Sequence, residues 1–326
     1  MGELAKILIY GDIHLNSKNY GAHVDYANES LNYYKKITEI VKERGATHLI
    51  GLGDFTFGRF HTLEYRTAVE TELMEQYRLV NGNHYELKGN HDKASYGMTE
   101  YEYYITKGLI KPSCNMTIGD IHITMVDYGQ ETIGTPNIGN PEKSINVVFG
   151  HNLFRFSDSS LPNMGKSIEL DSFDRWFGVD YIISGHIHKQ FMFDGLILKT
   201  VDGQTYGHRA MVQYPGCLSR PSYTPGSMDE VGQLILLTVK DNCEMQYDVL
   251  DVELLPIDES FNMSIKQAEK EAKEEKEKRV DISDIIQQLN GHNRGVGNPE
   301  DIIESLSGID DKYKKKAIDL LHAGMG

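Results

Sequence analysis

Gly89-Asn90-His91-Asp92 follows the expected strand at His84–Lys88 with an amide, an imidazole and a carboxylate in succession. Four short apolar runs elsewhere also end in glycine followed by a side chain that can bind a metal. These runs lead into Gly11-Asp12-Ile13-His14, Gly53-Asp54, Gly150-His151 and Gly185-His186-Ile187-His188. Apolar runs of this length are typical of buried strands, so the polar side chains should lie at strand ends, where loops converge. Their oxygen and nitrogen donors, without a thiolate, suit a site for two divalent ions.

The order of these five blocks resembles the calcineurin-like metallophosphoesterase family. The chain matches D-x-H, G-D, G-N-H-D, G-H and G-H-x-H in turn, over roughly residues 5–220. A single Gly-Asp or Gly-His at a strand end is most often part of a turn, but five ordered blocks are specific. Within the family, the chain looks most like the SbcD-type nuclease subunit of SbcCD complexes, in its phage form.

The N-terminal half shows alternating strand and helix patterns. Strands are expected at 5–11, 48–52 and 84–88, and helices at 24–44 and 62–79. This alternation is typical of parallel βαβ units. A capping box that starts at Thr99 predicts a further helix, to about Lys107.

From residue 114 onward, short strand patterns predominate, with one helix pattern near Leu170–Phe177. The expected strands are Cys114–Ile118, Ile121–Asp127, Ile145–Phe149, Asp180–Ser184, Phe191–Phe193, Leu196–Thr200, Ala210–Tyr214, Gln233–Val239 and Met245–Leu254. Two facing sheets with helices outside fit this order, which is an α/β fold. The family resemblance implies the four-layer αββα sandwich metallophosphoesterase fold, with a small C-terminal helical segment.

Pro256 marks the expected end of a metallophosphoesterase domain at 1–256. Residues 257–280 include a strongly charged helical stretch with almost no apolar stripe, which is typical of a solvated linker. Residues 281–326 carry short apolar stripes that must bury against something. They form either a small self-packed bundle or a docking segment, and the resemblance favours docking to an SbcC-like coiled-coil ATPase.

The resemblance distributes seven side chains over two metal ions, with three ligands for each ion and one shared carboxylate. The ligands are Asp12, His14 and His188 for the first ion, Asn90, His151 and His186 for the second, and Asp54 as the bridge. These donors suit Mn²⁺, with Fe or Zn as alternatives. A pair of such ions clamps a phosphate and makes a nucleophile available at neutral pH.

His91 is then the candidate general acid for the leaving oxygen, and Asp92 is expected to orient the catalytic groups through local hydrogen bonds. The sequence departs from SbcD-type nucleases in one respect. There, a histidine that supports the acid follows the bridging aspartate by a few residues. Here Phe57 falls near that place, and His61 or Arg59 could substitute.

The stretch Tyr214–Pro221 resembles a loop that borders the active site in SbcD-type proteins, although a plain turn explains its composition equally well. Cys217, Ser219 and Arg220 are its candidate substrate-binding residues, because an arginine fork suits a phosphate. The aromatic stretch Phe154–Phe156 could stack an unpaired base, or it could line the core.

A net charge of −15 argues against broad, passive binding of nucleic acid. It does not exclude a DNA substrate, because two divalent ions reverse the local charge. Cys114, Cys217 and Cys243 are far apart in sequence, which is typical of reduced thiols in a cytoplasmic protein. If the chain is phage-encoded, the expected location is the host cytoplasm. No signal peptide or membrane-spanning run is expected.

Three functions remain open. The leading expectation is a two-metal DNA nuclease subunit, exonuclease or endonuclease, that acts with an SbcC-like ATPase in DNA repair or recombination. Such a subunit could form a homodimer, since the helices at 24–44 or 62–79 could pair two copies. The alternative function is a small-nucleotide phosphodiesterase or phosphatase, because residues 255–263 leave little room for the capping domain of SbcD-type proteins. A non-catalytic scaffold is the third, although every expected ligand is present.

Overall fold

The computed structural model describes residues 2–19, 22–60, 62–93, 97–130, 138–139, 144–157, 167–172, 174–221, 231–241, 244–265, 314–315 and 318. The chain divides into two compact units, Met1–Phe261 and Asn262–Gly326. Apart from residues 314, 315 and 318, the expected docking segment at 281–326 lies outside the described residues, as does most of the expected linker at 257–280, and both stay predictions. None of the described helices combines the length and apolar character needed to cross a membrane. Neither Cys114 nor Cys217 forms a disulfide, and Cys243 lies outside the described residues.

The first sheet has six strands, four of them parallel. Its order is β14 (Met245–Glu253), β13 (Val231–Lys240), β1 (Glu3–Tyr10), β2 (His48–Gly51), β3 (His84–Glu86) and β4 (Lys111–Pro112). The strands β1 to β4 are parallel neighbours, whereas β13 pairs antiparallel with both β1 and β14. The parallel part arises from the βαβ pattern at the start of the chain.

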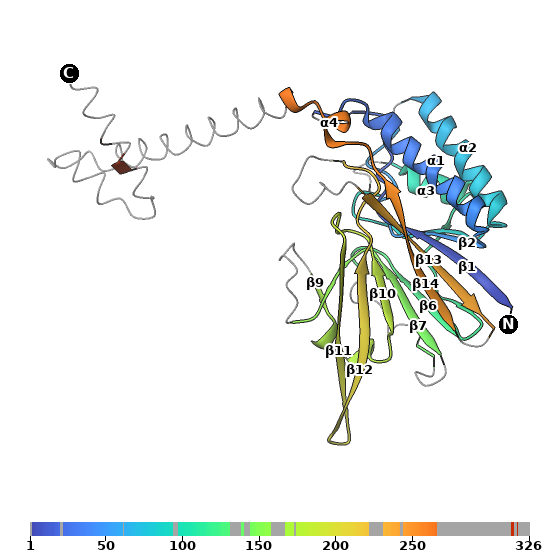
Figure 1. Ribbon diagram of the computed structural model, residues 1–326, viewed down its shortest axis with the longest axis vertical. Helices are drawn as coiled ribbons and strands as arrows, with labels where there is room; N and C mark the ends of the chain where they lie inside the picture. Colours follow the sequence, from blue (N-terminus) through green and yellow to red (C-terminus); the bar gives the residue numbers. More distant parts are fainter. Residues whose placement is uncertain are drawn as a thin grey trace. The chain divides into compact units, whose positions relative to one another are not determined.

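Three helices cover the outer face of the first sheet: α1 (Tyr26–Arg44), α2 (Leu63–Leu79) and α3 (Glu100–Thr106) (Figure 1). Helix α1 ends at Gly45, whose left-handed backbone (φ 62°) terminates the helical hydrogen bonds. The predicted capping box at the start of α3 is confirmed, with Thr99 and Glu102 bonding each other's backbone amides. Apolar side chains of these helices pack on those of the sheet, such as Leu8 and Leu49.

The second sheet also has six strands. Its order is β11 (Phe191–Val201), β12 (Gln204–Tyr214), β10 (Tyr181–Ser184), β7 (Ile145–Gly150), β6 (Ile121–Val126) and β5 (Met116–Ile118). Its outer face packs against the short pair β8 (Leu153–Arg155) and β9 (Ser167–Glu169), and against the 3₁₀ turns η1 (Leu170–Ser172) and η2 (Asp174–Trp176). The helix expected near Leu170–Phe177 is therefore replaced by two 3₁₀ turns.

The long hairpin β11–β12 corrects a second expectation. Phe191–Phe193 and Leu196–Thr200 belong to one continuous strand, and β12 begins before the expected strand at Ala210–Tyr214. The hairpin turns at Asp202 and Gly203, both with positive φ, and extends beyond the other strands of its sheet (Figure 1).

Between the two sheets lies a core to which both contribute. Ile9, Ile50 and Leu237 come from the first sheet, and Val147 and Ile183 from the second, and all are buried. Separate apolar clusters join each sheet to its outer cover. The expectation of an α/β fold with two facing sheets and helices outside is confirmed. The parallel strands β1, β2, β3, β7 and β10 all deliver their carboxyl ends to the loops that carry the five sequence blocks.

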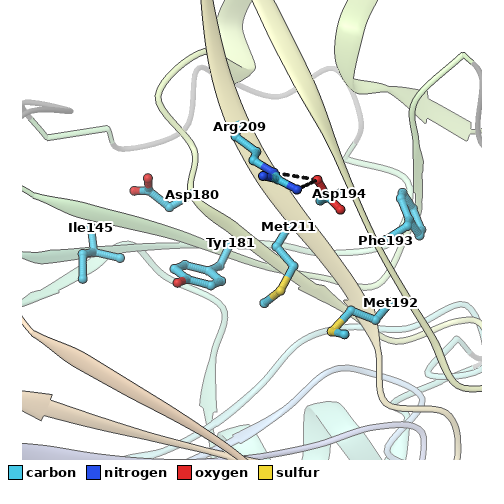
Figure 2. Close-up of a pocket in the computed structure, with 8 residues that line it drawn as sticks. All are labelled: Ile145, Asp180, Tyr181, Met192, Phe193, Asp194, Arg209 and Met211. Carbon is cyan, nitrogen blue, oxygen red and sulfur yellow. Dashed lines mark hydrogen bonds and ion pairs between the residues drawn. The ribbon is translucent and has the colours of Figure 1, made fainter.

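The opposite end of the second sheet holds a pocket of about 480 Å³ (Figure 2). It is lined by side chains from the beginnings of β7 and β10 and from β11 and β12, among them Tyr181 and Met192. Asp194 accepts a hydrogen bond from Arg209 there, at 2.6 Å. Because this pocket adjoins the amino ends of β7 and β10, the polar blocks at the carboxyl ends do not contribute to it.

Candidate metal centre

The loops after five strands bring acidic and imidazole side chains together. Two groups have ligand atoms that all lie within 4.8 Å of one another. The groups are Asp12, His14 and His188, and Asp12, Asp54 and His151. Asn90 and His186 join the second group through the contacts described below, so the fold gathers all seven side chains that the sequence singled out.

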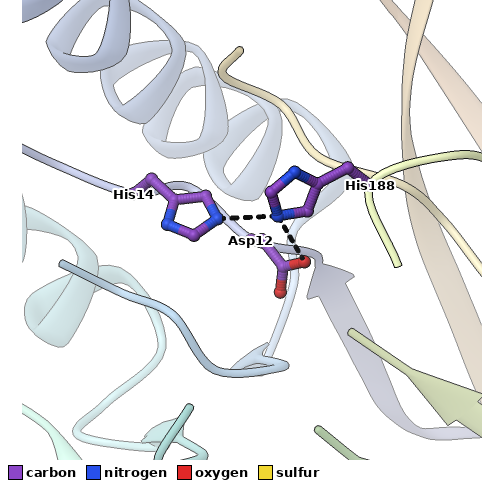
Figure 3. Close-up of side chains that lie close together, drawn as sticks. All are labelled: Asp12, His14 and His188. Atoms are coloured by element: carbon purple, nitrogen blue, oxygen red, sulfur yellow. Dashed lines mark hydrogen bonds and ion pairs between the residues drawn. The ribbon is translucent and has the colours of Figure 1, made fainter. Parts of the chain in front are cut away.

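The first group is drawn in Figure 3. His14 Nε2 and His188 Nε2 lie 3.0 Å apart, and His188 Nε2 lies 3.7 Å from Asp12 Oδ2. His14 Nε2 also lies 3.8 Å from Asp54 Oδ2. Asp54 therefore reaches this group as well as the second one.

The second group surrounds His151. Its Nδ1 donates to the carbonyl oxygen of Leu52 at 2.7 Å, so Nδ1 carries a proton and Nε2 faces the site. This Nε2 lies 3.3 Å from Asp54 Oδ2 and 3.1 Å from Asn90 Oδ1. His186 Nδ1 lies 2.9 Å from the same Asn90 oxygen. Asp12 belongs to both groups, and Asp54 lies between the imidazoles of His14 and His151.

These separations fit ligands that share a cation. Two ligand atoms each about 2.1 Å from a metal lie about 3.0 Å apart at a right angle and about 3.4 Å apart at a tetrahedral angle. The donor pairs described here are 2.9 to 3.8 Å apart. The donor set, with two carboxylates, one amide and four imidazoles, also matches the preferences of divalent transition metals.

The buried carboxylates require positive charge nearby. Burial raises the pKa of Asp12 to about 7. Burial by itself lowers the pKa of His151, but Asp12 and Asp54 outweigh this effect and raise it to about 9. For Asp54, burial raises the pKa, yet the neighbouring His151 outweighs burial and lowers it. The acidic groups are therefore stabilised by cationic His151 or by a bound cation, which supplies the same compensation with more charge.

The backbone at the site is strained in places that a ligand role explains. Among described non-glycine residues, only five have positive φ, and His14 (49°), Asp54 (50°) and His186 (77°) are three of them. Such conformations are uncommon and concentrate at functional sites. Gly89 serves the same purpose by allowing close approach, since a Cβ there would lie 2.1 Å from Asp54 Oδ1.

Asp92 fixes the loops rather than facing the donors. Its carboxylate accepts hydrogen bonds from the backbone amides of Phe55, Thr56 and Gly89, at 2.9 to 3.2 Å. It therefore ties the loop that carries Asp54 to the loop that carries Asn90, as a residue that positions the site would.

The side chain of His91 is exposed at the same site. Its backbone amide donates to Asp54 Oδ1 at 2.8 Å, and its ring centroid lies 5.2 Å from that of His14. The ring of Phe57 packs against that of His91, with ring centroids 4.6 Å apart. A phenyl ring occupies the place expected for a supporting histidine; Arg59 is exposed, and His61 lies outside the described residues.

Arg220 is buried, so the expected contact between its guanidinium and a substrate phosphate is not supported. It is 1% exposed, and its Nη1 donates to Leu255 O at 2.6 Å and to Ser260 Oγ at 3.2 Å. Ser260 in turn bonds buried Glu29 at 3.2 Å, so an acidic partner is close to the guanidinium. Arg220 thus holds the end of the first unit in place.

Cys217 and Ser219 are also buried, so the expected substrate contacts of this loop are not supported. Instead, the loop braces the metal centre. The Cys217 amide donates to His188 O at 3.2 Å, and the Leu218 amide donates to Asp12 O at 3.3 Å. Of the two roles left open for Phe154–Phe156, the structure favours core lining, because Phe154 and Phe156 are buried in the apolar cluster of the second sheet.

Sequence reasoning missed a hydroxyl network beneath His14. The Tyr26 hydroxyl donates to His14 O at 2.8 Å and lies 3.1 Å from Ser219 Oγ. Ser219 Oγ donates to Ile13 O at 2.5 Å. Both side chains are fully buried, so they hold the strained backbone of the Asp12 block. No sequence signal marks such a pair, since Tyr26 lies on a helix and Ser219 in a distant loop.

Tyr26→Phe should weaken Mn²⁺ binding by about tenfold or more, because residues that orient ligands commonly contribute 10–100-fold to affinity. Calorimetric titration with Mn²⁺ measures this, and Ser219→Ala should act in the same direction. The matched control is Tyr34→Phe, which removes a buried hydroxyl bonded to Gln76 at 2.8 Å. The control should lower thermal stability but leave Mn²⁺ affinity as in the wild type. Equal Mn²⁺ affinity in Tyr26→Phe and Tyr34→Phe would argue against a positioning role.

A model of the family described as "Calcineurin-like phosphoesterase" matches residues 5–190. Solved structures with a similar chain trace include a dimetal phosphatase from Danio rerio, at 10% identity and a TM-score of 0.39, covering 78% of this chain and 100% of that one. Another is the sulfate thiohydrolase SoxB from Thermus thermophilus, at 11% identity and a TM-score of 0.36, covering 77% of this chain and 57% of that one. No curated protein sequence matches.

Proposed function

Because the chain belongs to the calcineurin-like phosphoesterase family, a family of metal-dependent hydrolases, we propose that it hydrolyses phosphodiesters with two divalent ions. The observation that carries this proposal is the position of Asp54 between two groups of imidazole donors. In this proposal, Asp12, His14 and His188 hold one ion and Asn90, His151 and His186 hold the other. Mn²⁺ is the proposed metal.

When bound, the two ions would neutralise the phosphate and provide a nucleophile at neutral pH. The protein side chains supply the remaining requirements. As the oxygen of water bonds to phosphorus, the bond to the leaving oxygen breaks, and His91 donates the proton that this oxygen needs. Its position suits the task, because its backbone is bonded to Asp54 while its ring is exposed. Asp92 keeps the two loops in register through three backbone amides.

DNA is the substrate that we propose first, with the chain acting as an SbcD-like nuclease subunit. The five sequence blocks and the apolar stripes of residues 281–326 support this reading. In it, those stripes bind an SbcC-like coiled-coil ATPase, and the complex acts in DNA repair or recombination. A phage origin fits the resemblance.

A specific observation favours the second candidate, a small-nucleotide phosphodiesterase. In the described stretch 244–265, β14 ends at Glu253 and the short helix α4 (Ile257–Ser260) follows almost at once. Phe261 then packs on His23, with ring centroids 4.2 Å apart. No capping domain lies within that stretch, and the chain is strongly acidic. The missing domain leaves less surface to position duplex DNA, and the acidic charge repels its phosphates.

The full-length chain with Mn²⁺ should cleave single- or double-stranded DNA, and gel electrophoresis of labelled strands measures this with and without an SbcC-like ATPase. Hydrolysis of bis-p-nitrophenyl phosphate or of a cyclic nucleotide without any DNA cleavage would select the small-nucleotide function. If Mn²⁺ shows no stoichiometric binding and none of these esters is cleaved, the protein is a scaffold and both enzyme proposals are lost.

A further inference from the structure

Tyr128 lies at the edge of the metal centre, directly after Asp127 and β6. Its ring centroid lies 5.4 Å from that of His186 and 6.1 Å from that of His151. Its backbone amide donates to Lys88 O at 2.9 Å, which fixes the start of the loop. The side chain is only half-buried. An aromatic ring thus borders the imidazoles of the second donor group and remains partly accessible.

Lys93 covers this ring. Its ammonium lies 4.6 Å from the centroid of Tyr128, and the lysine side chain is exposed. The covered ring face therefore opens to solvent. A cation–π contact at an exposed site is weak, and stacking of a nucleobase on an aromatic side chain is stronger. An entering base can consequently displace the ammonium, which then remains next to the base as a cation for its phosphate.

The positions of His91 and Tyr128 distinguish the leaving group of a substrate from the group that stays on its phosphate. His91 contacts His14, whereas Tyr128 contacts His151 and His186. If His91 protonates the leaving oxygen, the group beside Tyr128 is the one that stays on the phosphate. A cation such as Lys93 also favours an anionic group there, against the overall charge of −15.

We propose that Tyr128 and Lys93 form a nucleotide subsite, in which the base of the retained nucleotide stacks on Tyr128 and Lys93 pairs with a phosphate oxygen. This inference rests on the proposed hydrolysis of phosphodiesters and specifies its substrate. The subsite makes the enzyme selective for esters whose retained group is a nucleotide. It serves both a DNA strand and a small nucleotide diester.

Two esters with the same leaving group test the subsite. Thymidine 5′-(p-nitrophenyl phosphate) retains a nucleoside, whereas methyl p-nitrophenyl phosphate retains only a methyl group. In Mn²⁺, the wild type should have a KM about tenfold or more lower for the thymidine ester. Tyr128→Ala should raise the KM of the thymidine ester about tenfold and leave that of the methyl ester unchanged. Tyr128→Phe should behave as the wild type, because stacking needs only the ring.

A binding measurement supplies a readout that does not need turnover. Titration calorimetry with thymidine 5′-monophosphate in Mn²⁺ should show binding about tenfold tighter than that of inorganic phosphate. Tyr128→Ala should remove this difference, and Lys93→Ala should weaken binding of the monophosphate. The control is Tyr206→Ala, which removes an exposed tyrosine on β12 and should change neither value.

The outcomes separate the two proposals. If the wild type hydrolyses neither ester, the proposed function fails, and the monophosphate titration still decides about the subsite. If the wild type treats both esters alike, or Tyr128→Ala weakens both equally, the subsite is wrong although the hydrolase function stands. Mn²⁺ affinity that falls in Tyr128→Ala would likewise overturn it, since the ring would then merely support His186.

Discussion

Replacing Asp54 by Asn is expected to reduce phosphodiester hydrolysis by about 10³-fold or more, equivalent to about 4 kcal/mol of transition-state stabilisation. The side chain is 1% exposed, and its Oδ2 lies 3.3 Å from His151 Nε2 and 3.8 Å from His14 Nε2. Asn has the same size and still accepts the hydrogen bond from the His91 amide. Only the charge between the two donor groups is lost, so the defect should come from metal binding rather than from misfolding.

A thermal shift measurement separates these causes. Mn²⁺ at about 100 times its dissociation constant should stabilise the wild type by about 2.7 kcal/mol per site, and most of this increase should vanish in Asp54→Asn. Without Mn²⁺, the variant loses the attraction between Asp54 and His151, while Asp12 and Asp92 lose a repulsive neighbour, so the metal-free unfolding temperature of each protein is the baseline for its Mn²⁺-induced increase.

Asp194→Asn is the matched control, since Asp194 pairs with Arg209 on the β11–β12 hairpin, away from the centre. That variant should keep both the Mn²⁺-induced shift and the hydrolytic rate. An Asp54→Asn protein with a full Mn²⁺-induced shift and normal turnover would place the shared carboxylate outside the site.

The site was predictable from sequence because its chemistry depends on short local patterns. A strand, a glycine and a ligand recur in this order in all five blocks. Gly89 shows why glycine is needed there, because its close approach to Asp54 leaves no room for a side chain. The parallel strands within both sheets then bring their carboxyl ends together, so linear order was enough to predict convergence. The start of α3 was likewise signalled locally, by the capping box at Thr99.

The errors arose where tertiary contacts decide. Arg220 has the residue type and loop position of a phosphate ligand, but its burial depends on Leu255 and Ser260, which are distant in sequence. The same holds for the bond between Tyr26 and Ser219. The β11–β12 hairpin was a different error, since its turn does have a local signal, Asp202-Gly203. The strand patterns on both sides of this turn are interrupted, so the expected strands were too short.

His91→Ala should reduce cleavage of a thymidine dinucleotide by about 10²- to 10⁴-fold, the usual contribution of a general acid. The alkoxide that leaves from a dinucleotide needs a proton, whereas p-nitrophenolate leaves without one. Hydrolysis of thymidine 5′-(p-nitrophenyl phosphate) by His91→Ala should therefore fall by less than about tenfold. The Mn²⁺-induced thermal shift should be retained, because the bond from residue 91 to Asp54 comes from the backbone. Equal losses on both esters would assign His91 to substrate binding instead.

The contact between Phe57 and His91 extends this prediction. Since a phenyl ring cannot accept a proton or a hydrogen bond from imidazole as a second histidine can, it leaves the candidate acid without that support. Phe57→His should raise the rate on the dinucleotide several-fold, on the order of 1 kcal/mol, and leave the p-nitrophenyl ester nearly unchanged. In the His91→Ala background the same substitution should have no effect on the dinucleotide, because the support acts only through His91. A gain of equal size in both backgrounds would mean that the new histidine works directly on the substrate, and the proton would then have another source.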